Sequence, residues 1–434
     1  MKKWLCFLII LIVGILIGLG CREKKESARS ASVPSKEEQE SEILVEDSLE
    51  EEIDENLWIT ETEETQEDLG GMPIPEEEQD KLRQELTNLA LRYREKVKNC
   101  EKGTASNWVI PHEVRLEIMK ELSKAGYAVA DLYNQCNLTN WERIDAFCEA
   151  IKAGEDGTAT VYEILENGGI SRLDFQVQDG VMVITMTQLD WDEKIEPLPI
   201  FMERWQAYAW QYTDKGYLIF ERYVPEGVEM SGQSILRIKP IKEEYRELTK
   251  KHLQAIGYQG NNLFLTSWDE ESLERVDFND LYEYLYFLKY DKRFDPTHYE
   301  EGIPKEEFEE LITQYFAITP ATLEKLAAYK PESRCYKWYA LACWNYTPNP
   351  KEVPIPEVID VIEREEGLLT LVVDAVWAQW DTDCAFTHEV TLRMKDQDHF
   401  EYVSNVIRLS EKNRLPQYNS RSQLAKKLEW QTKD

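Results

Sequence analysis

The sequence lacks the short motifs that mark nucleotide-dependent enzymes and the common hydrolases. It contains no GxxxxGK phosphate loop, no GxGxxG, and no GxSxG, HExxH or SxxK motif. Histidine is scarce, with five residues in a chain of 434. Because no motif fixes a substrate or a ligand set, we expect neither a cofactor nor a bound metal.

Cysteine is also sparse. Cys6 and Cys21 lie at the start of the chain, and the other six cysteines are too few for a disulfide framework in a chain of this length. No two cysteines have the CxxC spacing of a structural zinc or redox site. Cys335 and Cys343 lie in one expected strand, too far apart to form a disulfide with each other. We therefore expect most of the six to be buried free thiols.

Basic residues are nearly absent from one long segment. Between Ser35 and Asp80 the only basic residue is Lys36, and about half of the net charge of −33 lies in this segment. An acidic chain without a basic stripe repels phosphate, which argues against nucleic acid as a partner. Residues 22–75 also contain few large apolar side chains, so we expect them to form a disordered acidic linker.

One long apolar run stands at the start of the chain. It covers residues 4–20, follows two lysines and ends at Cys21. The run is longer than a typical signal segment and shorter than a typical membrane helix. The sequence GLGC, residues 18–21, resembles a bacterial lipobox, although Gly18 stands where that motif usually carries leucine.

The lipobox resemblance implies that Cys21 is lipidated and that the chain is cleaved before it, so that residues 1–21 are a lipoprotein-type signal and anchor. Two alternatives stay open. The run can remain as an uncleaved membrane helix, for which its basic flanks give an orientation signal, or it can be an ordinary secretory signal. All three interpretations export the rest of the chain.

The spacing of apolar residues in the remaining chain changes three times, between the period of a helix and that of a strand. Apolar residues at spacings of three and four predict a helix over residues 82–97, a second from Pro111 to Leu132 and a third after residues 137–140. Alternating segments then predict strands as far as about residue 240. Helices return, with Asp277 or Asn279 as one expected cap and Thr319 as another, and they are followed by a second series of strands.

This order predicts an α+β fold with two tandem domains, each made of helices followed by an antiparallel β-meander. The expected boundaries are residues 76–240 for the first domain, 241–410 for the second and 411–434 for a polar tail. One continuous domain is the alternative.

One hairpin can be assigned in detail. Asp214-Lys215-Gly216 predicts its turn, because Gly216 can adopt positive φ. By strict alternation, one face holds the heavier apolar set and is expected to face the core, and the other face points away. The first set is Tyr208, Trp210, Tyr212, Leu218 and Phe220, and the second is Trp205, Ala207 and Ala209.

The second half contains the stretches NNLFLTSW, DFNDLYEYLYFLKY, GIPKEEFEELITQYF, YKWYALACWNYTPN and LTLVVDAVWAQWDTDCAFTHEVTLR. Together they resemble an uncharacterised family of clostridial lipoproteins, classed as a domain of unknown function, over residues 235–409. The resemblance implies a lipoprotein on the outer face of the cell membrane of a Gram-positive bacterium. It brings no activity and no known site residues.

Three groups of residues are candidates for a catalytic or binding role. Asp190, Asp192 and Glu193 form a carboxylate cluster at a strand end, which can serve hydrolysis or calcium binding but is more often a solvated strand end. Cys384 and His388 resemble a dyad only if the chain turns between them, since four residues of strand separate them by about 13 Å. Exposed Trp or Tyr could stack on sugar rings, although most aromatics occupy expected core positions.

The sequence therefore favours a non-enzymatic, lipid-anchored extracytoplasmic protein that acts as a binding or assembly module at the bacterial surface. Its expected partners are the membrane, through the lipid on Cys21, and a cell-wall polymer or a protein. One rival is an enzyme that acts on wall polymers with a carboxylate pair such as Asp190 and Asp192. The other is a structural spacer.

We predict that the mature chain begins at a lipidated Cys21. Replacing Cys21 with Ala should block maturation, because the thiol that receives the lipid is lost, and should leave the leader attached. Intact-mass analysis of membrane-extracted protein measures this. A wild-type mass that still includes residues 1–20 would contradict the lipobox interpretation.

Overall fold

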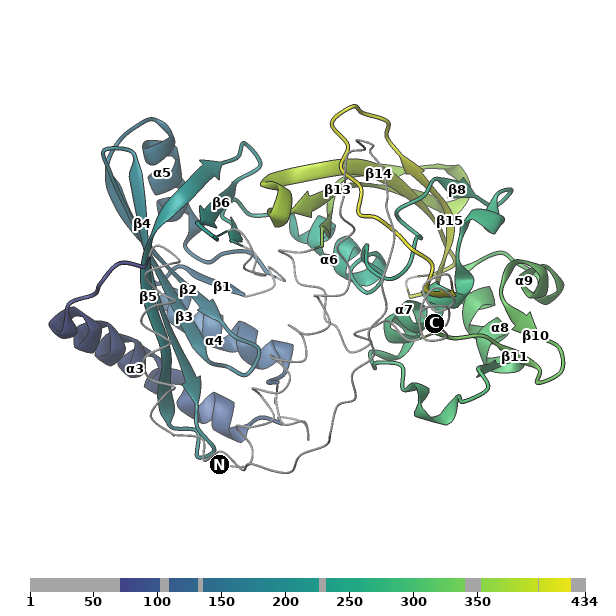
Figure 1. Ribbon diagram of the computed structural model, residues 1–434, viewed down its shortest axis with the longest axis horizontal. Helices are drawn as coiled ribbons and strands as arrows, with labels where there is room; N and C mark the ends of the chain where they lie inside the picture. The colour runs from purple at the N-terminus through teal and green to yellow at the C-terminus, as the bar shows by residue number, and fades with distance from the viewer. Residues whose placement is uncertain are drawn as a thin grey trace, which may run out of the picture. The chain divides into compact units, whose positions relative to one another are not determined.

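The computed structural model describes residues 71–101, 109–131, 136–225, 232–339, 353–396 and 398–422 (Figure 1). Apart from Pro225, these residues belong to one compact unit. The apolar run, Cys21, residues 22–70 of the expected linker and residues 423–434 of the expected tail lie outside the described residues. Within those ranges, no helix is both long and apolar enough to cross a bilayer.

The first half consists of three helices and a seven-stranded sheet whose strands are hydrogen-bonded in chain order. The first two strands are parallel, and the following pairs are antiparallel. The elements are α3 (Glu76–Asn99), α4 (His112–Lys124), β1 (Val129–Asp131), α5 (Trp141–Lys152), β2 (Gly157–Ile164), β3 (Ile170–Gln178), β4 (Val181–Trp191), β5 (Pro197–Tyr212), β6 (Tyr217–Arg222) and β7 (Gln233–Arg237).

Helices cover both faces of this sheet (Figure 1). Helices α3 and α4 share a core with Tyr162, Ile170 and Leu189 of the strands. Helix α5 shares a separate core with strand residues on the other face of the sheet, such as Val161 and Leu173. The predicted stripe of α3 is confirmed, because its residues at spacings of three and four are buried, namely Leu82, Leu86, Leu89, Tyr93 and Val97.

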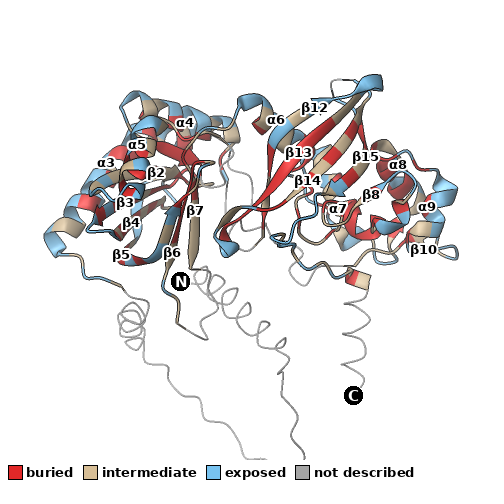
Figure 2. Cartoon of the chain, turned by 90° about the horizontal axis from the view of Figure 1, so that it is seen from above, coloured by how far each residue is buried: buried red, intermediate tan, exposed pale blue. Residues whose placement is uncertain are grey.

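The second half contains four helices and a five-stranded antiparallel sheet in the order β12-β13-β14-β15-β8, with a small sheet β10-β11-β9. Strand β13 is buried along most of its length (Figure 2). The elements are α6 (Glu243–His252), β8 (Trp268–Asp269), η1 (Leu273–Arg275), α7 (Phe278–Tyr290), η2 (Pro296–His298), β9 (Ile303–Pro304), α8 (Lys305–Tyr315), α9 (Pro320–Leu326), β10 (Tyr329–Lys330), β11 (Cys335–Tyr336), β12 (Ile355–Glu363), η3 (Glu365–Gly367), β13 (Leu368–Trp377), η4 (Ala378–Trp380), β14 (Thr382–Met394) and β15 (Phe400–Ile407).

The predicted α+β class, with two successive sets of helices followed by an antiparallel meander, is confirmed. Asp277 caps α7 through a hydrogen bond from the Asp280 amide, and Thr319 caps α9 through one from the Thr322 amide. The structure differs at Val129, which we placed in the second helix and which lies in β1. The long strand expected around Cys335 is only two residues in the described part, and Cys343 lies outside it.

The predicted faces of the β5–β6 hairpin are wrong in part, because β5 contains a β-bulge. Ala207 pairs with Arg222, but Ala209 pairs with Glu221, so Tyr208 is an extra residue in the ladder. The bulge inverts the alternation. Before it, Trp205 and Ala207 face the core of α5, and after it Trp210 and Tyr212 do so. Tyr208 is 70% exposed.

The ribbon formed by β5, β6 and β7 also contacts the second half. On its face away from the α5 core, Tyr217 and Ile219 of β6 form a buried cluster with Val376 of β13. Beside them the carboxylate of Glu357, on β12, is 5% exposed and accepts hydrogen bonds from the Tyr217 hydroxyl and from Arg237 at 2.9 Å. The two halves are therefore joined through a buried charge.

A lysine in the hairpin turn extends this charged cluster. Lys215 Nζ donates to Asp374 Oδ2 at 2.8 Å and to the Asp383 carbonyl at 2.8 Å, and it lies 3.6 Å from Glu357 Oε1. Thr387 donates to the other oxygen of Asp374 at 2.6 Å. The two carboxylates raise the pKa of Lys215 against the opposing effect of its burial, so the amine stays charged in the junction.

We predict that Glu357→Gln destabilises the chain strongly. Removing one member of a buried ion pair typically costs about 3–5 kcal/mol, because Arg237 and Lys215 would keep their charges without this partner. Denaturant unfolding measures the loss. Glu363→Gln on the same strand is the matched control, since Glu363 is exposed, and it should change stability by less than about 0.5 kcal/mol. Equal stabilities of the two variants would contradict the role of Glu357.

The bulge gives a second prediction. Trp205→Ala should lower the unfolding free energy by about 3–5 kcal/mol, because Trp205 is buried. Trp210→Ala should cost less, since Trp210 is only partly buried. Tyr208→Ala should change stability by less than about 0.5 kcal/mol. Thermal and urea unfolding of the three variants measure these losses of stability. Strict alternation predicts the opposite order for two of them, with a large loss for Tyr208→Ala and a small loss for Trp205→Ala.

Candidate functional site

The carboxylates predicted at the strand end serve the turn between β4 and β5. Asp192 Oδ1 accepts from the Lys194 amide at 2.7 Å and the Glu196 amide at 2.8 Å, and these bonds lower the pKa of Asp192. Asp190 accepts from the Trp191 amide and the Asn167 side chain, while burial raises its pKa. Glu193 is exposed in the same turn. These bonds account for the cluster as turn structure.

Cys384 and His388 do not form a dyad. His388 is fully buried, and its two ring nitrogens lie 2.8 Å from the Tyr258 hydroxyl and 2.6 Å from Asn405 Oδ1. Burial lowers the pKa of His388 to about 4. Cys384 is exposed, with Sγ 3.5 Å from Thr387 Oγ1, and partial burial of the thiol raises its pKa. The histidine is a core residue, and the thiol is not activated.

The other cysteines of the described ranges are also free. Cys148 is buried, whereas Cys100, Cys136 and Cys335 are half-buried, so the expectation of mostly buried thiols holds only for the first. Across the described ranges, no group of three or more His, Cys, Asp or Glu side chains is arranged to hold a metal ion. Cys21, the predicted lipidation site, lies outside those ranges.

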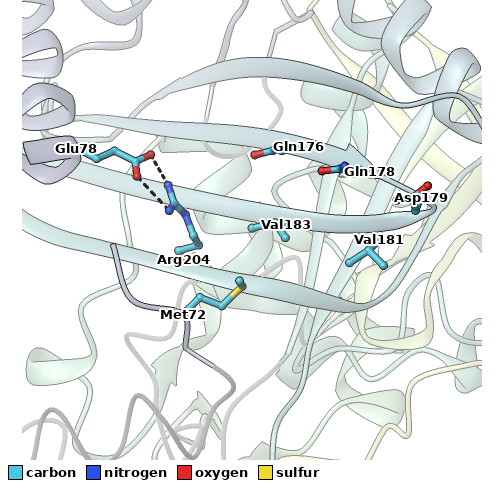
Figure 3. Close-up of a pocket in the computed structure, with 8 residues that line it drawn as sticks. All are labelled: Met72, Glu78, Gln176, Gln178, Asp179, Val181, Val183 and Arg204. Carbon is cyan, nitrogen blue, oxygen red and sulfur yellow. Dashed lines mark hydrogen bonds and ion pairs between the residues drawn. The ribbon is translucent and has the colours of Figure 1, made fainter. Parts of the chain in front are cut away.

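An open pocket of about 520 Å³ lies at one end of the seven-stranded sheet, on the face that carries α3 (Figure 3). In the figure Arg204 points toward Glu78 of the first turn of α3, and the two side chains form an ion pair. Met72 closes one side, and its amide donates to the Arg204 carbonyl at 2.7 Å. The lining residues are Met72, Glu78, Gln176, Gln178, Asp179, Val181, Val183 and Arg204.

The basic residue of the pocket lining, Arg204, is already paired. Arg204 holds both oxygens of Glu78 and also donates to Thr185 Oγ1 at 2.8 Å. The rest of the pocket wall consists of the glutamine amides, the carboxylate of Asp179 and apolar side chains, and none of its lining residues is aromatic. Such a pocket offers hydrogen bonds but little stacking area and no unpaired basic group for an anion.

A different surface is formed where the bulge turns Tyr208 outward. Tyr208 is 70% exposed, and its ring centroid lies 6.0 Å from that of Tyr223, which is 49% exposed and follows β6. The rings are inclined at 50°. We call these two residues the tyrosine pair. Large aromatic side chains exposed side by side on a strand ribbon are typical of contact surfaces rather than of cores.

Polar groups lie next to the tyrosine pair on the same ribbon. Glu221 precedes the end of β6, pairs with Ala209 across the bulge, and accepts from Gln233 Nε2 at 2.8 Å. Burial and the charge of Asp381 raise the pKa of Glu221. Gln211 donates to the Asp381 carbonyl, which anchors the ribbon beside the chain after η4.

A third exposed aromatic residue belongs to the same region. Trp380 in η4 is 48% exposed, and η4 lies against β7. The guanidinium of Arg414 stands 4.5 Å from the Trp380 ring centroid. Together with the tyrosine pair and the Glu221–Gln233 hydrogen bond, this surface offers apolar ring faces alongside carboxylate and amide groups. Such groups can stack on a sugar ring and bond its hydroxyls.

Sequence reasoning named Tyr208 but placed it in the core, and it missed Tyr223 and Trp380. The sequence carries one weak signal for the bulge, because Gln206 and Gln211 in WQAYAWQY are five positions apart and would lie on opposite faces of a regular strand.

The comparisons with known proteins give one match. The model of a protein family described as "Family of unknown function (DUF6070)" matches residues 79–421, a range that begins within α3 and contains all three sheets. No curated protein and no solved structure matches the chain.

Proposed function

We propose that this chain, which belongs to the DUF6070 family of unknown function, is a lipid-anchored extracytoplasmic module that binds a cell-wall glycan. The observation that carries the proposal is the tyrosine pair. The bulge directs a large aromatic residue into solvent and so exposes apolar area that a core position would bury. The chain forgoes a stabilisation of about 25 cal/mol for each Å² of apolar area left exposed. Bulges often re-aim a side chain next to a binding site.

The N-terminal pattern supports the proposed location. In this proposal the lipid on Cys21 holds the chain on the outer face of the membrane of a Gram-positive bacterium. Residues 22–70 then act as an acidic tether with a reach of about 40 Å or more, because like charges extend a flexible chain. A negative tether is also repelled by anionic lipid, which favours holding the body away from the membrane and near wall polymer.

The rival function, a wall-polymer hydrolase that uses Asp190 and Asp192, has less support. Asp192 accepts hydrogen bonds from the backbone of its own turn, Asp190 accepts from the Trp191 amide and the Asn167 side chain, and neither lines the pocket of Figure 3. An acid–base pair would instead face a common cleft that can hold the scissile bond.

We predict that purified full chain in detergent binds soluble wall-glycan fragments. Tyr208→Ala and Tyr223→Ala should each weaken binding about tenfold, which corresponds to about 1.4 kcal/mol for a lost stacking ring. Isothermal titration calorimetry measures the affinity, and thermal unfolding verifies that the variants are folded. Tyr290→Ala is the matched control, since Tyr290 is 45% exposed on α7, far along the chain from the pair.

Two results would overturn the proposal. One is that the wild-type chain binds no wall glycan. The other is that the Tyr208 and Tyr223 variants bind as tightly as the wild type and the Tyr290 variant, which would place any glycan site elsewhere.

A further inference from the structure

The chain after β15 forms a surface arm, residues 408–422, that ends in one buried charge. Most of its residues are exposed, and Leu409 is 97% exposed, so little apolar area holds the arm. Arg421 is the exception, because it is 2% exposed. A charged side chain is almost never buried to this degree unless it is paired.

Arg421 enters a pocket at the first two turns of α7. Its guanidinium lies 2.5 Å from Glu283 Oε1 and 3.9 Å from Asp280 Oδ1. It also donates to the carbonyls of Tyr339 at 3.1 Å and Gly260 at 3.2 Å. The fixed donors of a guanidinium suit such a set of carboxylate and carbonyl acceptors, whereas a lysine ammonium would satisfy fewer of them.

Neighbouring residues of the arm bind the same helix end. The Tyr418 hydroxyl donates to Asp280 Oδ2 at 2.7 Å and to Asp277 Oδ2 at 3.0 Å, and Ser420 Oγ donates to Asp277 Oδ2 at 2.8 Å. The Arg421 amide adds a bond to Asp280 Oδ2 at 2.9 Å. Side chains and backbone of the sequence Tyr-x-Ser-Arg are therefore recognised together.

The pocket is electrostatically unbalanced without its arginine. Asp277, Asp280 and Glu283 recur every three residues on one side of α7, and only Arg421 forms an ion pair with Asp280 and Glu283 among the described residues. Burial and the charge of Asp277 raise the pKa of Asp280 to about 6, although the hydrogen bonds from the arm oppose this. An emptied pocket would hold like charges at close range, so it favours a cation.

We infer that this pocket is a recognition site for an arginine-bearing Tyr-x-Ser-Arg segment, and that the C-terminal arm of a second copy of this chain can occupy it in exchange for the chain's own arm. The arm can withdraw at little cost in buried area, because Arg421 is the only buried residue among residues 408–422. Exchange of an identical element between copies is a low-cost route to assembly. The inference does not depend on glycan binding.

Pocket specificity is tested on the full chain carrying Arg421→Ala, which frees the pocket, with a labelled peptide of residues 415–422 and fluorescence anisotropy. The peptide should bind this variant at least tenfold more tightly than the wild-type chain, whose own arm competes. A peptide with lysine in place of Arg421 should bind at least tenfold more weakly. Equal binding of the arginine and lysine peptides, or equal binding to both chains, would overturn the assignment of the pocket.

Exchange between copies is tested by mixing two differently tagged full chains. One carries Arg421→Ala and keeps the pocket, and the other carries Asp280→Asn with Glu283→Gln and keeps the arm. The mixture should co-purify as a pair, whereas neither variant should pair with itself. In the control, a chain with Lys412→Ala, an exposed change on the same arm, takes the place of the chain with Arg421→Ala. This control chain should not pair with the pocket variant, because its own arm already fills its pocket.

Failure of the mixed variants to pair would overturn arm exchange, provided that both unfold cooperatively. If the pocket variant does not fold, wild-type chains of two tags are incubated together instead. They should then co-purify, and added arginine peptide should release the pair, whereas persistence of the pair in excess peptide would overturn the inference.

Discussion

The carboxylate of Glu357 is the constraint on which the arrangement of the two halves depends. It is buried on β12, and its partners Tyr217 and Arg237 both come from the ribbon of the first half. A buried charge without partners costs several kcal/mol, so β6 and β7 must stay on this strand. The apolar contact of Ile219 with Val376 adds area, whereas the directional bonds of the charged cluster help to fix the register between ribbon and sheet.

The same constraint explains why the ribbon needs a bulge. One face must present Trp210 and Tyr212 to the α5 core, while the other must present Tyr217 to Glu357. Trp205, farther back on β5, also belongs to the α5 core, although its odd number would direct it to the opposite face of a regular strand. One extra residue between these two requirements resolves the conflict, and Tyr208 is that residue.

Most of the fold was accessible from the sequence, because helices and strands that cover a core carry the period of their own geometry. The stripe of α3 is a local signal and was predicted correctly, and the α7 cap at Asp277 is one of the two positions that the sequence offered. Strand β1 was not predicted, since its three residues, which pair in parallel with β2, are too few to show an alternation of apolar and polar side chains. The tyrosine pair was missed for a related reason, because a bulge is decided by cores on both faces and its mark in the sequence is only the change of phase between Gln206 and Gln211.

The C-terminal arm shows the limit of composition more sharply. Its polarity predicts a solvated tail, and the exposure of most of its residues agrees with that prediction. Arg421 differs because its environment is built 138 residues earlier in the chain, by carboxylates whose spacing on α7 looks like an ordinary solvated helix face. Burying a guanidinium is favourable only where its acceptors are fixed in advance, and a helix end capped by Asp277 supplies that rigidity. A polar segment held by one such side chain is bound specifically yet over a small area, which is the combination that lets a ligand be both recognised and released.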